Sequence, residues 1–244
     1  MKSLLDRVDG VLAAHSEPTG ALAALCAMTP LDSLLSVMRD DASSLAVLAR
    51  RSYRHRNGFD KIVIAEPAGS PLKLVLHVWP QGGPRTADDI HNHRWNFSSV
   101  VVSGTLHLEL YEPDISGPDY AVMEYRSLPG AGNFELRPKG TTTASARKSE
   151  TLHAGSTYTW ACQRLHRAWG ALGHVTATLV VQGAPSQAST TVLVRGGNAA
   201  RLSGVQCLAP LPADAIGTTL DIVASSRAHN AWDSEEESPT RRSA

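Results

Sequence analysis

The sequence has no excess of charge of either sign, because its 23 Lys and Arg residues equal its 23 Asp and Glu residues. Binding to nucleic acid or to an anionic membrane surface depends on a field of positive charge. The 244-residue chain carries no such net charge. We therefore expect neither nucleic acid nor a membrane as a partner, and expect a small-molecule substrate instead.

Cysteine is also scarce. Cys26, Cys162 and Cys207 lie far apart and form no Cys-x-x-Cys pair, which argues against a disulfide framework and a cysteine-based zinc site. Asp6 and Asp9 interrupt the N-terminal stretch where a signal peptide needs apolar residues, and no apolar run approaches the length of a membrane-spanning helix. These features predict a cytoplasmic protein.

Two common catalytic motifs are missing as well. The sequence contains neither a Gly-x-Ser-x-Gly nucleophile motif nor a phosphate-binding Gly-x-x-x-x-Gly-Lys-[Ser/Thr] loop. The sequence therefore argues against a serine hydrolase of that type and against a P-loop nucleotidase. The chain is nevertheless long enough to bury the hydrophobic core of one large domain.

The two ends of the chain differ from its middle. Residues 1–51 are predicted to be helical, because Leu4, Val8, Val11 and Leu12 recur at the spacing that puts apolar side chains on one helix face. This helical segment also offers a surface on which a homodimer could form. Residues 221–244 are polar with mixed charge, which predicts a disordered tail.

The middle of the chain, residues 52–220, is predicted to be a β-barrel or sandwich. Short runs rich in β-branched and aromatic residues recur here, and many are bounded by Gly, Pro, Asn or Asp. The runs are 61–64, 72–79, 99–102, 106–111, 120–125, 134–137, 158–161, 174–182 and 190–194.

The most informative motif is the run from Ile90 to Trp95, which contains His91 and His93 and lies just before a predicted strand. Alternate residues of a strand point to the same side, so these two imidazoles would share one face. Imidazole is a ligand for Fe, Zn, Cu and Ni, and a third group from another strand would complete a metal site.

The order of motifs resembles the cupin superfamily. A strand followed by a glycine turn leads into the His-x-His pair, and a strand–Gly104–strand segment follows it. Within that superfamily the chain looks most like the cysteine-dioxygenase-like enzymes, in which a Tyr precedes the third histidine by eight residues. Tyr158 stands in that relation to His166. The resemblance implies a mainly β double-stranded β-helix, or jelly roll, over about residues 55–185, with a helical segment before it.

Carried over by position, the resemblance implies that His91, His93 and His166 bind Fe(II) without a carboxylate ligand. Zn, Mn or Ni are the less favoured ions. His153 is a rival for the third position, and Glu109 is considered as a fourth ligand or a base, although a solvent-exposed sheet face is the simpler interpretation of its alternation.

The family's substrate site suggests further residues. The predicted strand 72–79 places His77 and Trp79 on one face toward the pocket, and Trp95 lies beside the metal ligands. Lys61 is the nearest match to the family's carboxylate-binding Arg. The remaining candidates are Arg54 and Arg56 for the same carboxylate, and His77 and His153 for proton transfer.

The chain departs from the family in two places. Ser98 stands where animal members have a Cys linked covalently to a Tyr, and the Ser-x-His-x-Tyr relay after the third ligand is absent, since residues 179–183 read Leu-Val-Val-Gln-Gly. These departures put the family's own thiol oxidation in doubt.

The functional hypothesis is a non-heme Fe(II) oxygenase of the cupin fold that uses O₂ on a small carboxylate-bearing metabolite, such as an amino acid or thiol. Two alternatives are kept. One is a metal-dependent cupin isomerase, lyase or hydrolase without redox chemistry, and the other is a cupin that binds a ligand without catalysis.

Overall fold

The computed structural model describes residues 3–28, 31–80, 90–130, 132–195 and 199–236. Its helices are α1 (Leu4–Ala14), α2 (Pro18–Met28), α3 (Leu31–Asp40), α4 (Ala42–Ala49), α5 (Ala199–Leu202) and α6 (Ala213–Glu236). Its strands are β1 (Tyr53–Arg54), β2 (Asp60–Ala65), β3 (Lys73–Trp79), β4 (Ile90–His91), β5 (Trp95–Ser103), β6 (Thr105–Pro113), β7 (Asp119–Ser127), β8 (Asn133–His153), β9 (Thr157–Trp160), β10 (Leu165–Gly170), β11 (Thr176–Pro185), β12 (Thr190–Arg195) and β13 (Gly204–Cys207).

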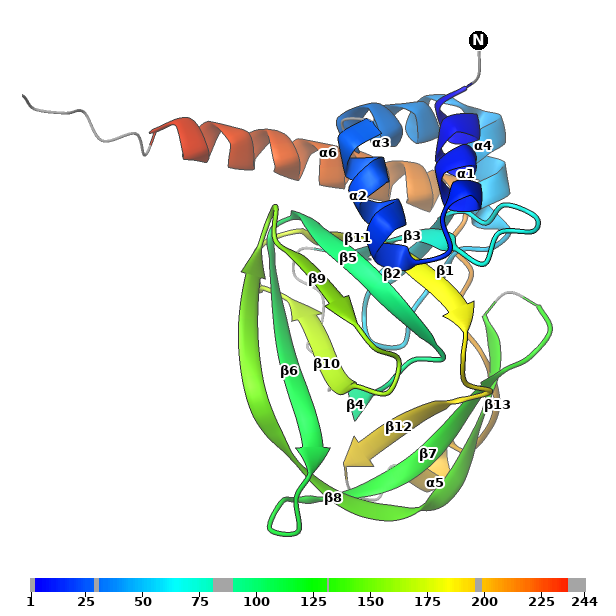
Figure 1. Cartoon of the computed structure of the whole chain (residues 1–244), viewed down its shortest axis with the longest axis vertical. Helices are drawn as coiled ribbons and strands as arrows, with labels where there is room; N and C mark the ends of the chain where they lie inside the picture. Colours follow the sequence, from blue (N-terminus) through cyan, green and yellow to red (C-terminus); the bar gives the residue numbers. More distant parts are fainter. Residues whose placement is uncertain (1–2, 29–30, 81–89, 131, 196–198, 237–244) are drawn as a thin grey trace, which may run out of the picture.

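The strands form two antiparallel sheets (Figure 1). The six-stranded sheet has the order β1-β2-β3-β11-β5-β9, and the seven-stranded sheet has the order β13-β8-β6-β10-β4-β12-β7. Eight of these strands, β3-β11-β5-β9 in one sheet and β4-β10-β6-β8 in the other, have the neighbour order of a jelly roll, the architecture of the cupins. The predicted mainly β, cupin-type fold with helices at its N-terminus is therefore confirmed.

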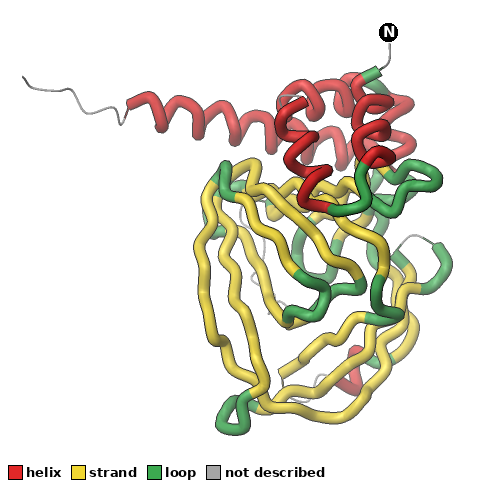
Figure 2. The backbone as a smooth tube through the Cα atoms, in the orientation of Figure 1, coloured by secondary structure: helices red, strands yellow, loops and turns green. Residues whose placement is uncertain are grey.

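The long strand β8 bends the seven-stranded sheet round on itself. Its first half pairs with β7 and its second half pairs with β6, so one continuous strand joins two edges of the sheet. Gly140, with a φ of 128°, and Pro138 lie where the pairing changes register. Figure 2 shows the curved sheet that results.

Strand alternation separates two cores. On β3 the side chains of Leu74, Leu76 and Val78 face the helices and join the larger core, while His77 and Trp79 face the space between the sheets. The helices α1–α4 and α6 contribute apolar side chains to that larger core and lie along the six-stranded sheet (Figures 1 and 2). The functional candidates on β3 therefore lie inside the jelly roll.

Helix ends in the N-terminal segment are fixed by local hydrogen bonds. Ser3 and Asp6 form a reciprocal capping box at the start of α1, and the Asp41 side chain accepts hydrogen bonds from the backbone N–H groups of Ser43 and Ser44 at the start of α4. These caps satisfy donors that a helix terminus otherwise leaves unpaired.

The expectation of a disordered tail from residue 221 was wrong for the part that the structure describes. Helix α6 continues to Glu236, because Ile216, Leu220 and Val223 are buried against the N-terminal helices and anchor its first half. Residues 237–244, the rest of the predicted tail, lie outside the described residues.

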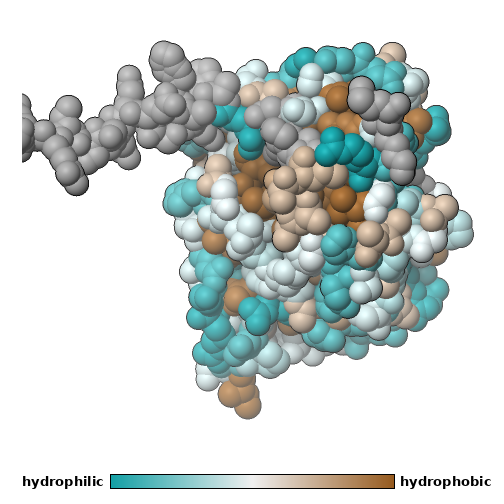
Figure 3. Space-filling model, turned by 45° about the horizontal axis from the view of Figure 1, so that its top comes forward, coloured by the Kyte–Doolittle hydropathy of each residue, from teal (hydrophilic) through white to brown (hydrophobic). Residues whose placement is uncertain are grey.

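An apolar hollow of about 210 Å³ lies between the helices and the six-stranded sheet. Leu25, Leu34 and Val102 are among its lining residues, and hydrophobic residues also gather on the surface beside the helices (Figure 3). A homodimer formed through the helical segment stays a prediction.

No single helix within the described ranges is both long and apolar enough to cross a membrane, although the bent pair Pro18–Met28 and Ser33–Asp40 reaches that length and composition together.

The turn between β5 and β6 gives a test of the fold. Gly104 has a φ of 70°, and an added Cβ would lie against the backbone of Val175 and Thr176. We expect Gly104→Ala to lower the free energy of unfolding by about 3 kcal/mol or more, from left-handed strain and overpacking together. Gly155→Ala is the control, because Gly155 has a φ of 90° with nothing within 4 Å. It should cost only about 1–2 kcal/mol in urea unfolding. Equal losses would contradict the steric explanation.

Candidate metal centre and cavity

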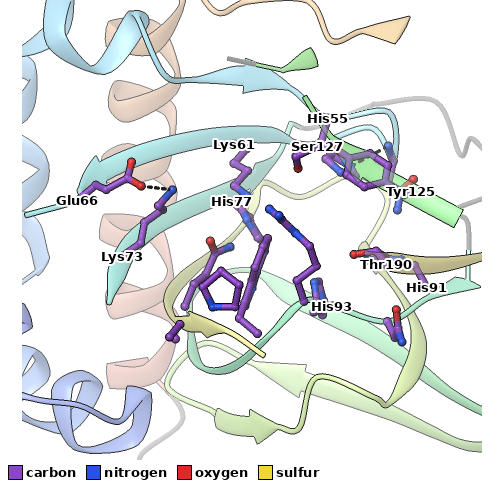
Figure 4. Close-up of a pocket in the computed structure, with 18 of the residues that line it drawn as sticks. His55, Lys61, Glu66, Lys73, His77, His91, His93, Tyr125, Ser127 and Thr190 are labelled. Carbon is purple, nitrogen blue, oxygen red and sulfur yellow. Dashed lines mark hydrogen bonds and ion pairs between the residues drawn. The ribbon is translucent and has the colours of Figure 1, made fainter. Parts of the chain in front are cut away.

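A cavity of about 440 Å³ opens between the two sheets. It is lined by β1, β2 and β3 on one side and by the segment around β4 on the other (Figure 4). A smaller inner space of about 50 Å³ continues toward β10 and shares His77, His91 and His93 with the outer cavity. The predicted site residues can therefore be placed relative to two adjoining hollows that share part of their lining.

The structure brings the three predicted ligands together. His91 ends β4, His93 follows it in the connection to β5, and His166 lies on β10 directly opposite His91 in the antiparallel pairing. One nitrogen of each ring lies within 4.8 Å of the others. No other group of three His, Cys, Asp or Glu side chains in the described part of the chain is close enough to hold a metal ion.

The ring geometry fits a shared metal ion. Nδ1 of His166 lies 3.1 Å from the carbonyl oxygen of Arg164 and donates to it, so Nε2 carries the free lone pair. That Nε2 lies 3.3 Å from Nε2 of His93. Two nitrogens bound to one ion at about 2.1 Å would be about 3.0–3.4 Å apart.

Burial favours the neutral form that metal binding needs. Desolvation, followed by the nearby charge of other histidines, lowers the pKa of His93 and of His166 well below 6.5. Neutral imidazoles are the ligating form, so these two side chains are ready to bind a cation at neutral pH.

Asn92 holds the turn that carries two of the ligands. Its backbone N–H donates to the carbonyl oxygen of Thr191 at 3.1 Å, and its side-chain oxygen accepts from the backbone N–H of Thr191 at 2.7 Å. The backbone N–H of His93 donates to the carbonyl oxygen of Cys162 at 2.9 Å. The segment that carries the two histidines is therefore tied to β12 and to the connection between β9 and β10.

Two cationic side chains face the cavity around one indole ring. Nζ of Lys61 lies 5.5 Å from the centroid of the Trp95 ring, and the guanidinium carbon of Arg94 lies 5.0 Å from it, which are cation–π distances. Burial, and after it the charge of Arg94, lowers the pKa of Lys61 from 10.5 to about 8. Lys61 and Trp95 were predicted for this cavity, whereas Arg94 was not.

His77 lies between the outer cavity and its inner extension. Its ring lies 4.6 Å from Phe59, and Nε2 is buried without a hydrogen-bond partner among the described residues. Burial, with a further contribution from the positive charge of Lys61, lowers the pKa of His77 well below 6.5. Trp79 is 9% exposed and lines only the inner extension. His77 is thus a neutral ring with a free nitrogen beside the ligand cluster.

Arg56 lines the cavity, but Arg54 does not. Strand alternation turns Arg54 outward, where its guanidinium forms a bidentate ion pair with Asp60 at 2.6 and 3.0 Å. The expectation that Arg54 contacts substrate is therefore corrected.

His153 is also outside the site. It is exposed at the end of β8 opposite Thr105, whereas His166 is opposite Leu110 of the same strand β6. Five residues of strand separate the two positions, roughly 17 Å along the sheet. Its proposed roles as a rival ligand and a proton carrier are not supported by this position.

Two more residues lie on outer faces. Glu109 accepts from Arg167 at 2.6 Å and from the Tyr111 hydroxyl at 2.7 Å, away from the cavity. Ser98, the position of the family's cross-linked Cys, is buried against α2, where its hydroxyl lies 2.9 Å from that of Thr19. A cross-link from this position into the cavity is excluded by the direction of the side chain.

His55 and Arg94 are two of the cavity residues that the sequence analysis did not predict. His55 stacks on Phe59 at 4.4 Å, and its Nδ1 accepts from the backbone N–H of Asn57 at 3.2 Å, so Nε2 carries the proton of the neutral ring. The proximity of Arg94 to the His-x-His pair was a usable signal for Arg94, whereas nothing local distinguished His55 from the neighbouring charged residues.

No protein family and no curated protein matches the sequence of this chain. Solved structures with a similar arrangement of strands include hydroxypropylphosphonic acid epoxidase from S. wedmorenis, KdgF from Halomonas sp. and a recombinant oxalate oxidase in complex with glycolate.

The epoxidase matches at 14% identity and a TM-score of 0.34, over 55% of this chain and 55% of its own. KdgF matches at 13% identity and a TM-score of 0.32, over 54% of this chain and 86% of its own. The oxidase matches at 15% identity and a TM-score of 0.34, over 56% of this chain and 55% of its own. The match spans about half the length of the epoxidase and of the oxidase. Likenesses this distant carry no argument about metal, substrate or reaction.

Asn92→Ala tests whether the turn positions the ligands. Loss of its hydrogen bonds to Thr191 should loosen the segment that carries His91 and His93 and weaken metal binding by about 10–100-fold, as is usual for residues that orient ligands. Competition with a chromophoric chelator measures the affinity. Asn133→Ala is the control, since that side-chain amide, at the start of β8 and outside the cavity, donates to the carbonyl oxygen of Pro129. Unchanged affinity in Asn92→Ala would show that the turn does not need its anchor.

Lys61→Met tests the cost of the buried ammonium group. The lowered pKa means that the folded state opposes the charge, so the variant should be more stable by about 1–2 kcal/mol at pH 7. Between pH 8 and 10.5 the unfolded chain binds the proton more strongly, so the wild type gains stability as pH rises and the difference between the two proteins shrinks. Urea unfolding at several pH values measures both effects, and a destabilised variant at pH 7 would contradict this account.

Proposed function

We propose that this protein is a non-heme Fe(II)-dependent oxygenase of the cupin fold that acts on a small anionic metabolite, such as a carboxylate-bearing amino acid or thiol. The observation that carries the proposal is the three-histidine cluster at the inner end of a cavity whose outer wall is cationic. Neutral ligands leave a divalent ion its full charge, which favours an anionic substrate.

His91, His93 and His166 are the residues that would hold the ion. A bound Fe(II) would supply a site for substrate coordination and the activation of O₂. Imidazole ligands accept Zn, Cu and Ni as well, so the donor set fits iron without requiring it.

The chain's own residues would bind and orient the substrate. Lys61 offers a positive charge in a partly buried site, where attraction to an anion is stronger than in water. His77, neutral and with a free Nε2, would accept a proton from the substrate. Phe97 and Trp160 pack at 4.9 Å from His93 and 4.5 Å from His166, and exclude water from the inner side of the cluster.

A second candidate function is a metal-dependent isomerase, lyase or hydrolase that uses a Lewis-acid ion such as Zn, Mn or Ni. Two observations favour it. Three histidines with an open position also make a catalytic zinc site, and Ser98 points away from the cavity. Metal identity and dependence on O₂ separate the two functions.

Metal content and oxygen uptake test the proposal. Wild-type protein purified without chelator should contain close to one iron per chain by plasma mass spectrometry, and His166→Ala should contain almost none. His153→Ala is the matched control and should keep its iron, because this histidine is exposed and outside the cavity. The iron-loaded wild type should then consume O₂ with at least one member of a panel of thiols and amino acids.

Other results for metal content and oxygen uptake would favour a different function. Zinc or nickel at one ion per chain, with no oxygen uptake, would replace the oxygenase by the Lewis-acid function. Absence of metal even after anaerobic Fe(II) loading, with His166→Ala indistinguishable from wild type, would refute both and leave a ligand-binding cupin.

A further inference from the structure

The outer wall of the cavity contains two positive charges that the described residues do not neutralise. Lys61 and Arg94 both line it, and both lie at cation–π distance from the same Trp95 ring. No carboxylate of the described chain forms an ion pair with either of them. Nε of Arg94 is buried and has no hydrogen-bond partner in the described chain.

The nearest acids are committed elsewhere. Glu66 at the cavity margin pairs with Lys73 at 2.5 Å (Figure 4), and Asp60 pairs with Arg54 on the outer side of the sheet. Two like charges kept close together, one of them on a guanidinium whose Nε is buried without a partner among the described residues, are unfavourable unless a counter-charge accompanies them. Among the described residues, the two charges therefore have no carboxylate partner of their own.

We propose that Lys61 and Arg94 together bind one doubly charged phosphate-type group, so that the substrate of this cavity is a small phosphate ester or phosphonate. A carboxylate would neutralise only one of the two charges. A phosphate-type group carries nearly two negative charges and three acceptor oxygens, enough for the ammonium and the guanidinium donors at once.

The ligand has two ends, and this proposal concerns the end that Lys61 and Arg94 bind. For the other end, it rests on the proposed function, which places the reacting part of the substrate at the histidines. Lys61 lies on β2, whereas Arg94 directly follows His93 in the connection from β4 to β5, so the two charges meet around the Trp95 ring beside the segment that carries the histidines. A cavity of about 440 Å³ is of the size that holds a small metabolite. The doubly charged group would therefore fix the orientation of the molecule while its other end reaches the histidine cluster.

Anion binding to the metal-free protein tests the proposal apart from any reaction. Chelator-treated wild type and His166→Ala are titrated by calorimetry at pH 7 and constant ionic strength with inorganic phosphate, methylphosphonate, sulfate and acetate. We expect the three tetrahedral anions to bind at least 10-fold more tightly than acetate, in both proteins. Lys61→Met and Arg94→Met should each lose at least 10-fold in affinity for phosphate, and Lys61→Arg should stay within a few-fold of wild type.

Arg54→Met is the matched control, because that guanidinium belongs to the same segment of the chain but points away from the cavity. It should bind phosphate as the wild type does. Lys61→Met is expected to be more stable than wild type, so its loss of binding would not come from unfolding.

Equal affinity for phosphate and acetate, or an equal loss in Arg54→Met and Arg94→Met, would overturn the proposal. Failure of the metal experiment leaves this result untouched, since the anion site is measured without metal. Iron-dependent oxygen uptake combined with no preference for tetrahedral anions would instead refute the phosphate-type substrate and keep the oxygenase.

Discussion

The pairing of β4 with β10 is the constraint on which the site depends. Strand β4 contains only Ile90 and His91, and it lies between β10 and β12. Its register puts His91 directly opposite His166, two residues that are 75 positions apart in the chain. The turn through Asn92, which is bonded to Thr191, then brings His93 to the same point.

The alternation of strand faces made much of this arrangement predictable. The run 72–79 indicated a strand with His77 and Trp79 on one side, and the structure places both inside the jelly roll. The fold class and the gathering of three histidines followed from local pattern and from the resemblance to cupins. A period of two residues is a local property, so a single sequence can reveal it.

The sequence alone did not reveal which side chains of a strand point into the cavity and which point outward. Arg54 and Arg56 look equivalent in sequence, yet the pleat sends one to Asp60 and the other to the cavity. His153 lies near the motif in the sequence but at the far end of β6 in space. The helical continuation after residue 221 was missed because its first half is stabilised by packing against distant helices, which composition does not show.

The two walls of the cavity differ in how they are supported. Helices cover the outer side of the six-stranded sheet that carries Lys61, whereas the outer side of the sheet that carries His91 and His166 is partly open to solvent and bears the Arg167–Glu109 pair. Local opening is easier where fewer buried contacts have to break. Amide hydrogens of β4 and β10 should therefore exchange with solvent sooner than those of β3 and β11, so that the wall carrying the histidines would loosen while the opposite wall stays folded.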